Sequence, residues 1–416
     1  MNFQVLTGDF TLSARRLVVV TFLISGTLAW FFLLQVYLED ILLSIIPDLF
    51  WVQMGTVLFF GFGVFSAIVG SLIVKKIDRR KFLIAWVTLG IISTISLILF
   101  HGTLFCVISS IFLGLSLGLG LPSSLALLSD CTMTEDRGRV AGITILETFV
   151  IAFLTLAIVQ ILDLDIINIV ILVTVIRSIS FLALILHKTE ETNEKGKPGL
   201  VGNAYREFVF YLIPWIMFVV AASTASNVVR ASTEAQSLES AIKLGNVFRY
   251  AFIAIFGFVS GIVIDRIGRK QTIIIGLITL GIGFGLLGFV LPSSTTIIVY
   301  FMTSGIAWGS FLTVFLVIPG DLSISGSREM FYALGTICPM IILFSFSVID
   351  TTWLTNLILE ISPSSFSQIL SIILFISIVP VMRAKETLVE RKKQKRRMKD
   401  YTKKVGKLIE DFKAND

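Results

Sequence analysis

Charged residues are scarce in this chain of 416 residues. Asp, Glu, Lys and Arg make up 15% of it, and 55% of the residues are hydrophobic. Soluble domains usually carry about a quarter of charged residues and less apolar surface. A soluble fold could not bury this much apolar side chain, so the composition predicts a membrane protein.

The residue types that build most metal and catalytic sites are also scarce. Both histidines, His101 and His187, stand at the ends of apolar runs. The three cysteines (Cys106, Cys131, Cys338) are far apart and have neither metal-ligand spacing nor the pattern of a disulfide framework. The loop Gly-x-x-x-x-Gly-Lys-Ser/Thr, which binds nucleotide phosphates, does not occur. We therefore expect no metal, no cofactor, no enzyme activity and no ATP-driven pumping.

Long apolar runs are abundant. A helix that crosses the hydrocarbon core needs about 20 mostly apolar residues. Twelve such runs occur, at 17–38, 50–74, 82–101, 103–129, 140–162, 166–187, 207–229, 243–264, 271–291, 294–319, 329–349 and 364–382. They do not alternate polar and apolar residues, as membrane strands would. The sequence predicts an all-α membrane protein with twelve transmembrane helices.

Basic residues fall almost entirely on alternate connections between these runs. They occupy Arg15 and Arg16, 75–81, Arg137 and Arg139, 188–206, 265–270, Arg328 and the segment 383–416. Short loops rich in Lys and Arg stay in the cytoplasm. We therefore expect a multi-pass protein of the cell membrane with both termini cytoplasmic. The net charge of +6 then reflects topology and indicates no nucleic-acid partner.

The basic tail, 383–416, has the pattern of a partly amphipathic helix. Apolar residues recur at three- and four-residue steps among lysines: Met398, Tyr401, Val405, Leu408 and Phe412. Such a stripe fits a helix that lies on an anionic lipid surface. A solvated tail that only fixes the topology is equally compatible with the sequence.

The polar segment 188–206 divides the chain into two six-span halves. We predict bundles at 1–187 and 207–382, joined by a cytoplasmic linker. The halves repeat one another, since VGSLIVKKIDRRK (69–81) aligns with VSGIVIDRIGRKQ (259–271) at an offset of 190. At an offset of 191, these residues match: Gly114 with Gly305, Gly118 with Gly309, Asp130 with Asp321, and Arg137 with Arg328. Parallel six-span repeats occur in a large class of transporters whose solute site lies mid-membrane between the halves.

The chain resembles the major facilitator superfamily along nearly its whole length, the tail excepted. That family's signature loop reads Gly-x-x-x-Asp-Arg-x-Gly-Arg-Arg/Lys. It is matched position by position by Gly261, Asp265, Arg266, Gly268, Arg269 and Lys270. The resemblance implies two pseudo-symmetric six-helix bundles. Some drug exporters of the family carry a Gly-Pro pair in the fifth span, which reads GITILETFVIAFLTLAIVQ here. Its absence argues against drug/proton antiport.

The resemblance also implies a gate at the cytoplasmic ends of the bundles. Asp265 would face the start of the span that begins near Arg137 and Arg139, where a helix N-terminus favours an anion. Gly268 would supply a turn with positive φ. Arg269 and Lys270 would act as cytoplasmic anchors.

The first copy of this loop departs from the pattern. Lys75 stands where the Asp should be, and Asp78 stands where the Gly should be, followed by Arg79. Asp tolerates the turn conformation. We predict a charge-swapped latch between Lys75 and Glu329, which follows Arg328 at the start of span 11. The alternative is that Lys75 is only a charge that fixes the topology.

Two ionisable residues, Glu147 and Arg177, fall inside spans 5 and 6. Folding these spans as a hairpin about residue 164 brings the two residues to within about 6 Å of the same height. Ionisable groups inside spans are costly and are by default functional candidates. The pair is either structural, or Glu147 takes a proton and releases Arg177 during transport.

Further candidates would line a central cavity. Ser223, Asn227 and Arg230 share one face of span 7, and Asn246, Arg249 and Tyr250 share one face of span 8. The arginines are compatible with an anionic solute, or with an outer gate formed with Glu39, Asp40, Glu234 or Glu239. In the family, spans 1, 7 and 10 line the cavity; here they contribute Trp30, Gln35, Trp215, Trp308 and Ser310. Each of these is also compatible with a packing role.

These patterns favour a secondary active transporter that moves a small organic solute by alternating access, with proton coupling through Glu147 as one option. The expected partners are the solute, protons and the lipid bilayer, and a monomer is expected. A transporter-like sensor or scaffold, which binds a solute without moving it, is the alternative.

Overall fold

A computed structural model describes residues 14–99, 102–186, 201–233, 238–290, 293–323, 326–348 and 352–388. Over these residues the chain is folded into helices joined by short connections. Twelve of the helical segments are long and apolar enough to cross a membrane. The predicted all-α architecture with twelve spans is thus confirmed, and the chain is a multi-pass membrane protein.

The helices fall into two sets that follow the two halves of the sequence. The first set is α2 (Ala14–Ile45), α3 (Leu49–Ile73), the 3₁₀ turn η1 (Val74–Lys76), α4 (Arg79–Leu99), α5 (Thr103–Gly118), α6 (Leu121–Cys131), α7 (Arg137–Leu162) and α8 (Ile166–Leu186). The second set is α9 (Val201–Thr233), α10 (Glu239–Arg266), α11 (Arg269–Phe289), α12 (Ser294–Leu322), α13 (Arg328–Val348), α14 (Thr352–Ile361), α15 (Pro363–Ile376) and α16 (Ile378–Arg383).

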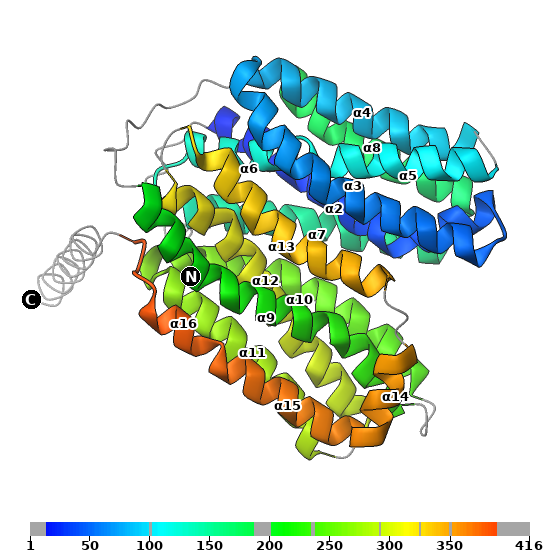
Figure 1. Cartoon of the computed structure of the whole chain (residues 1–416), viewed down its shortest axis with the longest axis vertical. Helices are drawn as coiled ribbons and strands as arrows, with labels where there is room; N and C mark the ends of the chain where they lie inside the picture. The colour runs from blue at the N-terminus through cyan, green and yellow to red at the C-terminus, as the bar shows by residue number, and fades with distance from the viewer. Residues whose placement is uncertain are drawn as a thin grey trace, which may run out of the picture.

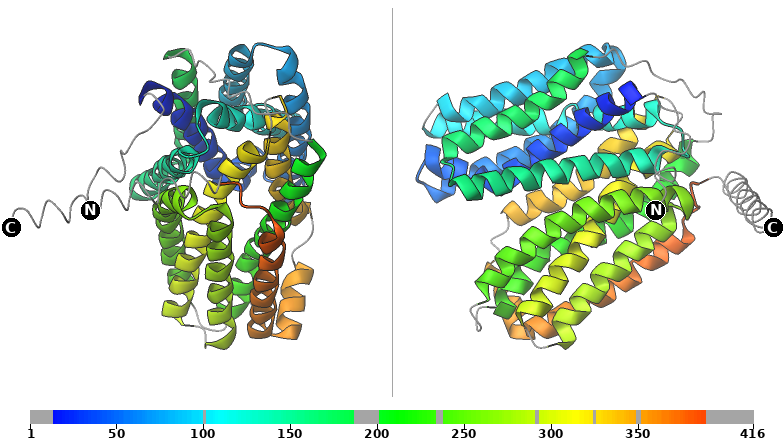
Figure 2. Two further views of the ribbon diagram at one scale, coloured as in Figure 1. Left: turned by 90° about the vertical axis from the view of Figure 1, so that its left-hand side faces the viewer. Right: turned by 180° about the vertical axis from the view of Figure 1, so that it is seen from behind.

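Each set forms a bundle, and the two bundles lie side by side (Figures 1 and 2). The N-terminal bundle meets the C-terminal bundle chiefly where α7 packs on α10 and where α3 packs on α13. These two pairs are related by the internal repeat, since α3 and α7 are the second and fifth spans of their half and α10 and α13 those of theirs. The interface is therefore pseudo-symmetric.

Span boundaries differ from the prediction at three places. The fourth span is divided between α5 and α6, because Pro122 starts a new helix and Gly120 lies against the Trp86 ring. Helix α9 begins at Val201, so residues 201–206 of the predicted linker are helical, and residues 188–200 lie outside the described chain. His101, His187, Glu234 and the tail beyond Leu388 also lie outside it, as does the side chain of Glu239.

The third difference is α14, a helix of 10 residues between the last two spans, which the run-length criterion did not find. Its Leu354 and Ile358 are buried and stand one turn apart, facing the bundle. They pack it against α9 and α15. A helix this short is marginally stable on its own, and the tertiary packing of one face supplies the missing stability.

Backbone-to-backbone packing joins α7 to α10. A Cβ on Gly261 would lie 2.4 Å from the carbonyl oxygen of Gly138 and 2.8 Å from the Cα of Gly142. Only glycine permits so close an approach of two membrane helices. The bundles are therefore in direct contact near the end that carries the loop between α10 and α11. We call this end, with Lys75, Arg139, Arg266 and Lys385, the basic end.

Candidate gate and solute site

Polar contacts between the bundles gather at the basic end in two ion-pair networks. In the first, Asp130 at the end of α6 pairs with Arg79 of its own bundle and with Arg328 of the other. In the second, Asp321 at the end of α12 pairs with Arg269 of its own bundle and with Arg137 of the other. Each aspartate thus joins one arginine from each bundle.

The two networks occupy repeat-related positions, yet they differ in burial. The side chains of Asp321, Arg269 and Arg137 are at most 2% exposed, whereas those of Asp130, Arg79 and Arg328 are 10–16% exposed. Breaking a buried pair by removing one partner is far more costly than breaking a pair that water can reach. The Asp321 network is therefore the stronger constraint.

Asp265 makes a further contact between the bundles at the N-terminus of α7. Its carboxylate accepts the backbone N–H of Gly138 at 3.0 Å and that of Arg139 at 2.9 Å. The guanidinium of Arg139 lies 3.7 Å away. The unpaired N–H groups and positive end of a helix stabilise an anion in this position. The contact joins the bundles, and its role in gating stays a prediction.

The predicted pairing of Lys75 with Glu329 is wrong. Glu329 accepts from Arg79 instead, with 3.1 Å between Oε1 and Nη2. Lys75 is exposed and has no ion-pair partner within the described residues. The reason is that α3 ends at Ile73 and the turn η1 directs Lys75 outward, while Arg79 opens α4 beside the other bundle.

Two other expectations about these loops also need correction. Asp78 does not adopt a positive φ; it caps α4 by accepting the N–H of Lys81 at 2.9 Å. Gly268 does have the positive φ expected, +127°. Arg269 is not an exposed anchor but a buried member of the Asp321 network. Lys270 donates to the carbonyl oxygen of Met382 at 2.9 Å.

Three acidic residues important to this end were not assigned a role from the sequence. Asp130 and Asp321 could have been found, because they match in the repeat. Glu386 could not: it follows α16 and accepts the N–H groups of Arg269 at 2.9 Å and Lys270 at 3.2 Å, which caps α11. The next residue, Thr387, donates to Asp321 at 3.0 Å. The start of the tail is thereby joined to the Asp321 network.

The predicted pair of Glu147 and Arg177 is not formed. Glu147 accepts from Thr21 of α2 at 3.2 Å. Helix α2 packs against both α7 and α8, so the two consecutive spans do not form the hairpin on which the prediction rested. The predicted heights of Glu147 and Arg177 in the membrane depend on that hairpin. In the structure Glu147 contacts Thr21, whereas Arg177 contacts Trp30 and Trp86.

Arg177 lies instead inside the N-terminal bundle between two indole rings. Its guanidinium carbon is 4.7 Å from the ring centre of Trp30 and 4.3 Å from that of Trp86. It donates to Thr27 at 2.7 Å and is fully buried. Cation–π contact with both rings partly replaces the hydration that the charge has lost. Trp30 is therefore a packing residue and does not line a cavity.

Gly90 provides the space for this guanidinium, because a Cβ there would lie 2.6 Å from Nε of Arg177. We predict that Gly90→Ala lowers the free energy of unfolding by about 1–3 kcal/mol, since the rings prevent the guanidinium from moving aside. Thermal denaturation in detergent measures this. Gly285→Ala is the matched control: its nearest neighbour would be 3.7 Å away, so it should be neutral. Equal losses in both variants would contradict the prediction.

The other cavity candidates divide into buried and accessible residues. Trp215 is buried and donates to the carbonyl oxygen of Gly335 at 3.1 Å, and Ser310 is buried against Ser260 at 2.9 Å. Both are packing residues. Gln35 and Arg230 are exposed. The half-buried candidates are Ser223, Asn227, Asn246, Arg249, Tyr250 and Trp308.

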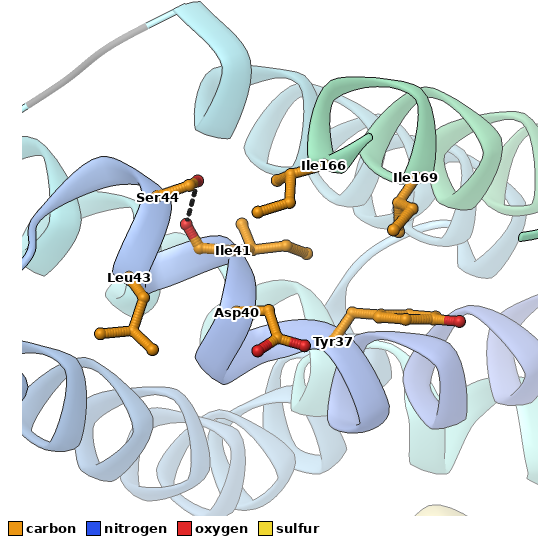
Figure 3. A pocket seen from close by; sticks show the side chains of 7 residues that line it. All are labelled: Tyr37, Asp40, Ile41, Leu43, Ser44, Ile166 and Ile169. Atoms are coloured by element: carbon orange, nitrogen blue, oxygen red, sulfur yellow. Dashed lines mark hydrogen bonds between the residues drawn. The ribbon is translucent and has the colours of Figure 1, made fainter. Parts of the chain in front are cut away.

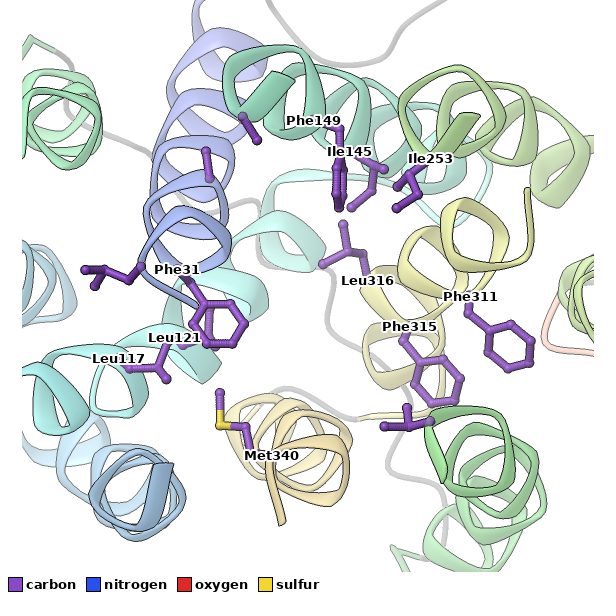
Figure 4. Packing of buried hydrophobic residues seen from close by; sticks show 14 of the residues in the cluster. Phe31, Leu117, Leu121, Ile145, Phe149, Ile253, Phe311, Phe315, Leu316 and Met340 are labelled. Atoms are coloured by element: carbon purple, nitrogen blue, oxygen red, sulfur yellow. The ribbon is translucent and has the colours of Figure 1, made fainter. Parts of the chain in front are cut away.

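Between the networks and the middle of the membrane, the bundles meet through apolar side chains (Figure 4). Ile145 and Phe149 of α7 face Leu316 of α12, and Phe31 of α2 and Met340 of α13 approach the same centre. These buried side chains form an apolar layer between the bundles.

A shallow hollow of about 430 Å³ lies at the opposite end of the N-terminal bundle (Figure 3). It is lined by Tyr37, Asp40, Ile41, Leu43, Ser44, Ile166 and Ile169 of α2 and α8. All seven lining residues belong to the N-terminal bundle.

Comparison with known proteins places the fold but gives no near relative. No family model matches the chain, and no curated protein matches its sequence. Its structure is similar to that of the human organic anion transporter MFSD10 (TETRAN), with a TM-score of 0.65 and 13% identity over 88% of this chain and 99% of that one.

It is also similar to two structures of the proton:xylose symporter XylE. One is bound to 6-bromo-6-deoxy-D-glucose, with a TM-score of 0.67 and 13% identity over 89% of this chain and 96% of that one. The other is a double tryptophan mutant, with a TM-score of 0.67 and 14% identity over 89% and 95%. Identities this low establish the fold alone. The chain therefore has the major facilitator superfamily fold.

Proposed function

We propose that this protein is a secondary active transporter that moves a small organic solute by alternating access, with its basic end in the cytoplasm of the cell. The observation that carries the proposal is the pair of repeat-related networks, in which Asp130 and Asp321 each hold an arginine from either bundle. The similar transporters of the same fold support it.

The networks suit a gate that opens and closes. Ion pairs at the water-facing end of a bundle can exchange their protein partners for water, so the joined and separated arrangements differ by a modest free energy. The apolar layer behind them blocks passage while the gate is closed. The described arrangement corresponds to the form closed toward the cytoplasm.

The gate is asymmetric, and this asymmetry favours an order of opening. Asp265 holds α10 to α7, whereas the equivalent residue Lys75 makes no such contact on the α3 side. The Asp130 network is also the more exposed of the two. We infer that the bundles separate first between α3 and α13 and pivot about α7 and α10.

A flux measurement with the purified protein in liposomes tests this proposal. A radiolabelled solute inside should drive saturable counterflow of the same solute from outside. Binding of a solute without any flux would instead favour a sensor or scaffold. One observation supports that second candidate: Glu386 and Thr387 join the start of the tail to the gate, so a change at the gate would reach the tail.

Proton coupling, if present, is expected to depend on Glu147. Its Oε2 is buried and has no hydrogen-bond partner within the described chain, while Oε1 accepts from Thr21. A carboxyl group buried beside the hydroxyls of Thr21 and Ser25 can be neutral in one form and charged in another. Arg177 takes no part in this scheme, because it is enclosed by Trp30 and Trp86.

We predict that Glu147→Gln abolishes stimulation of uptake by a pH gradient and leaves solute counterflow within about two-fold of the wild type, because exchange needs no net proton movement. Uptake and counterflow are measured in the same liposomes. Thr21→Val is the companion variant: it removes the hydroxyl but keeps the carboxyl group, so the gradient should still act. Unchanged gradient-driven uptake in Glu147→Gln would refute the proton role.

A further inference from the structure

Arg249 carries a positive charge at the interface between the bundles, near the middle of the membrane. Arg249 of α10 is half-buried, and no acidic side chain of the described residues pairs with it. Its guanidinium carbon lies 5.3 Å from the ring centre of Tyr250 and 5.7 Å from that of Phe301. These rings hold the charge in place and leave part of it accessible. A cation held in this way inside a span is a candidate ligand site.

Aromatic side chains from both bundles surround this level. At 1.5 Å per residue, Arg249, Trp308 and Phe31 each lie about 20–25 Å from the basic end of their helices. These helices are 28, 29 and 32 residues long, or about 42–48 Å, so the three residues lie near the midpoints of their helices. Phe149 of α7 stacks on Tyr250 of α10 across the interface, with ring centres 6.2 Å apart.

Apolar side chains of α2, α12 and α13 line the same interface between the bundles. Phe31, Phe315 and Met340 are 5–8% exposed, whereas Ile145 and Phe149 around them are at most 1% exposed. Figure 4 shows Phe31 and Met340 approaching one centre from different bundles, with Phe315 on the side of Phe311. All three side chains are buried and contribute to the apolar packing between the bundles.

Trp308 of α12 lies one turn from Gly305, which packs against Arg249, and its indole N–H is an unused donor. It is half-buried, its ring is edge-on to Trp215 and Phe218, and its indole N–H has no hydrogen-bond partner within the described chain. An indole combines a large apolar face with a single polar contact. It is suited to pack against a flat ring and to bind one oxygen atom.

Hydroxyl groups on α12, in contrast, are already in use. Thr303 donates to Tyr300, Thr313 donates to Gly257 and Gly309, and Ser310 bonds to Ile306 and Ser260. A polyhydroxylated solute needs several convergent donors and acceptors. Besides the half-buried Asn246 and Tyr250, this region offers the cation of Arg249 and the indole N–H of Trp308, and a guanidinium favours an anionic group over a neutral hydroxyl.

We infer that the transported solute is an amphipathic organic anion, with a flat apolar body that packs on Trp308 and an anionic head that binds Arg249. This inference rests on the proposed function for its transport step. Burial of the body supplies most of the affinity, and the charge-assisted contact with Arg249 selects for the anion.

The test uses two compounds of the same shape. 2-Naphthoate carries a flat body and a carboxylate, and 2-naphthalenemethanol carries the same body without the charge; D-xylose represents a polyol. Binding is measured by calorimetry on the protein in nanodiscs, with empty nanodiscs subtracted. We expect saturable binding of 2-naphthoate, binding of the alcohol about ten-fold weaker or less, and no detectable binding of xylose.

Variants separate the head contact from the body contact. Arg249→Gln should lower the affinity for 2-naphthoate to that for the alcohol and leave the alcohol unchanged, whereas Arg249→Lys should keep a preference for the anion. Trp308→Ala should weaken both compounds together. Arg383→Gln is the matched control, because that arginine is exposed where α16 ends, at the basic end. Absent binding of 2-naphthoate, or equal binding to the wild type and Arg249→Gln, overturns the inference.

Flux in liposomes distinguishes this inference from the proposed function. Binding of 2-naphthoate through Arg249 without counterflow would uphold the site and refute transport. Saturable counterflow of xylose without binding of 2-naphthoate would uphold transport and refute the site.

Discussion

Asp321→Asn is expected to lower the free energy of unfolding by about 3–5 kcal/mol, the cost of leaving a buried charge without its partner. Asp321 is the only carboxylate described in contact with Arg137, and it also pairs with Arg269. Both guanidinium groups are at most 2% exposed, so water cannot take over the role of the carboxylate without opening the interface. Thermal denaturation of the purified protein in detergent measures the loss.

The repeat provides the matched control for this change. Asp130→Asn removes the equivalent carboxylate from the network whose side chains are 10–16% exposed. Water can reach Arg79 and Arg328, and Glu329 still accepts from Arg79, so this variant should lose about 1 kcal/mol or less. If the two variants lose the same stability, burial is not what separates the networks.

Asp265→Ala is expected to slow counterflow at least ten-fold while the protein stays folded. The change removes the acceptor of two N–H groups at the start of α7, Gly138 and Arg139. Such charge-assisted bonds contribute about 2 kcal/mol in total once desolvation is counted. That is roughly a thirty-fold shift in the equilibrium between closed and open forms. The protein would then spend most of its time with its basic end open.

Lys75→Ala is the control at the repeat-related position. Lys75 is exposed and makes no contact of this kind, so its counterflow should equal that of the wild type. Slow counterflow in both variants would indicate that the loops matter for insertion or topology. Slow counterflow in Asp265→Ala alone would support the asymmetric gate.

Much of the fold could be predicted from the sequence, because the membrane imposes a minimum length on each apolar run. The in-register repeat also identified the second signature loop and the turn at Gly268. The helix α14 was missed because it is too short for that criterion, although Leu354 and Ile358 bury one of its faces. The break in the fourth span needed the contact between Gly120 and Trp86, which sequence spacing does not contain.

Side-chain partners were harder to predict than helices. Glu329 does contact the other bundle, but through Arg79, four residues beyond Lys75, because η1 ends α3 early. The pairing of Glu147 with Arg177 failed because two consecutive spans need not be neighbours: α2 packs against both. Glu386 caps α11, which begins more than a hundred residues earlier in the sequence, and no local sequence pattern predicts such a contact.

We propose that ion pairs and the Asp265 contact hold the bundles together at the basic end. The repeat-related residues Ile77 and Ile267 are exposed on the loops of opposite bundles and are suitable for spin labels. The three native cysteines would first be replaced.

The decisive measurement is the distance distribution between labels at 77 and 267, by pulsed electron paramagnetic resonance in nanodiscs without solute. We predict a single population with a short distance between the two labels in the wild type. In Asp265→Ala a second population with a longer distance should dominate. The same distribution in both proteins would contradict it.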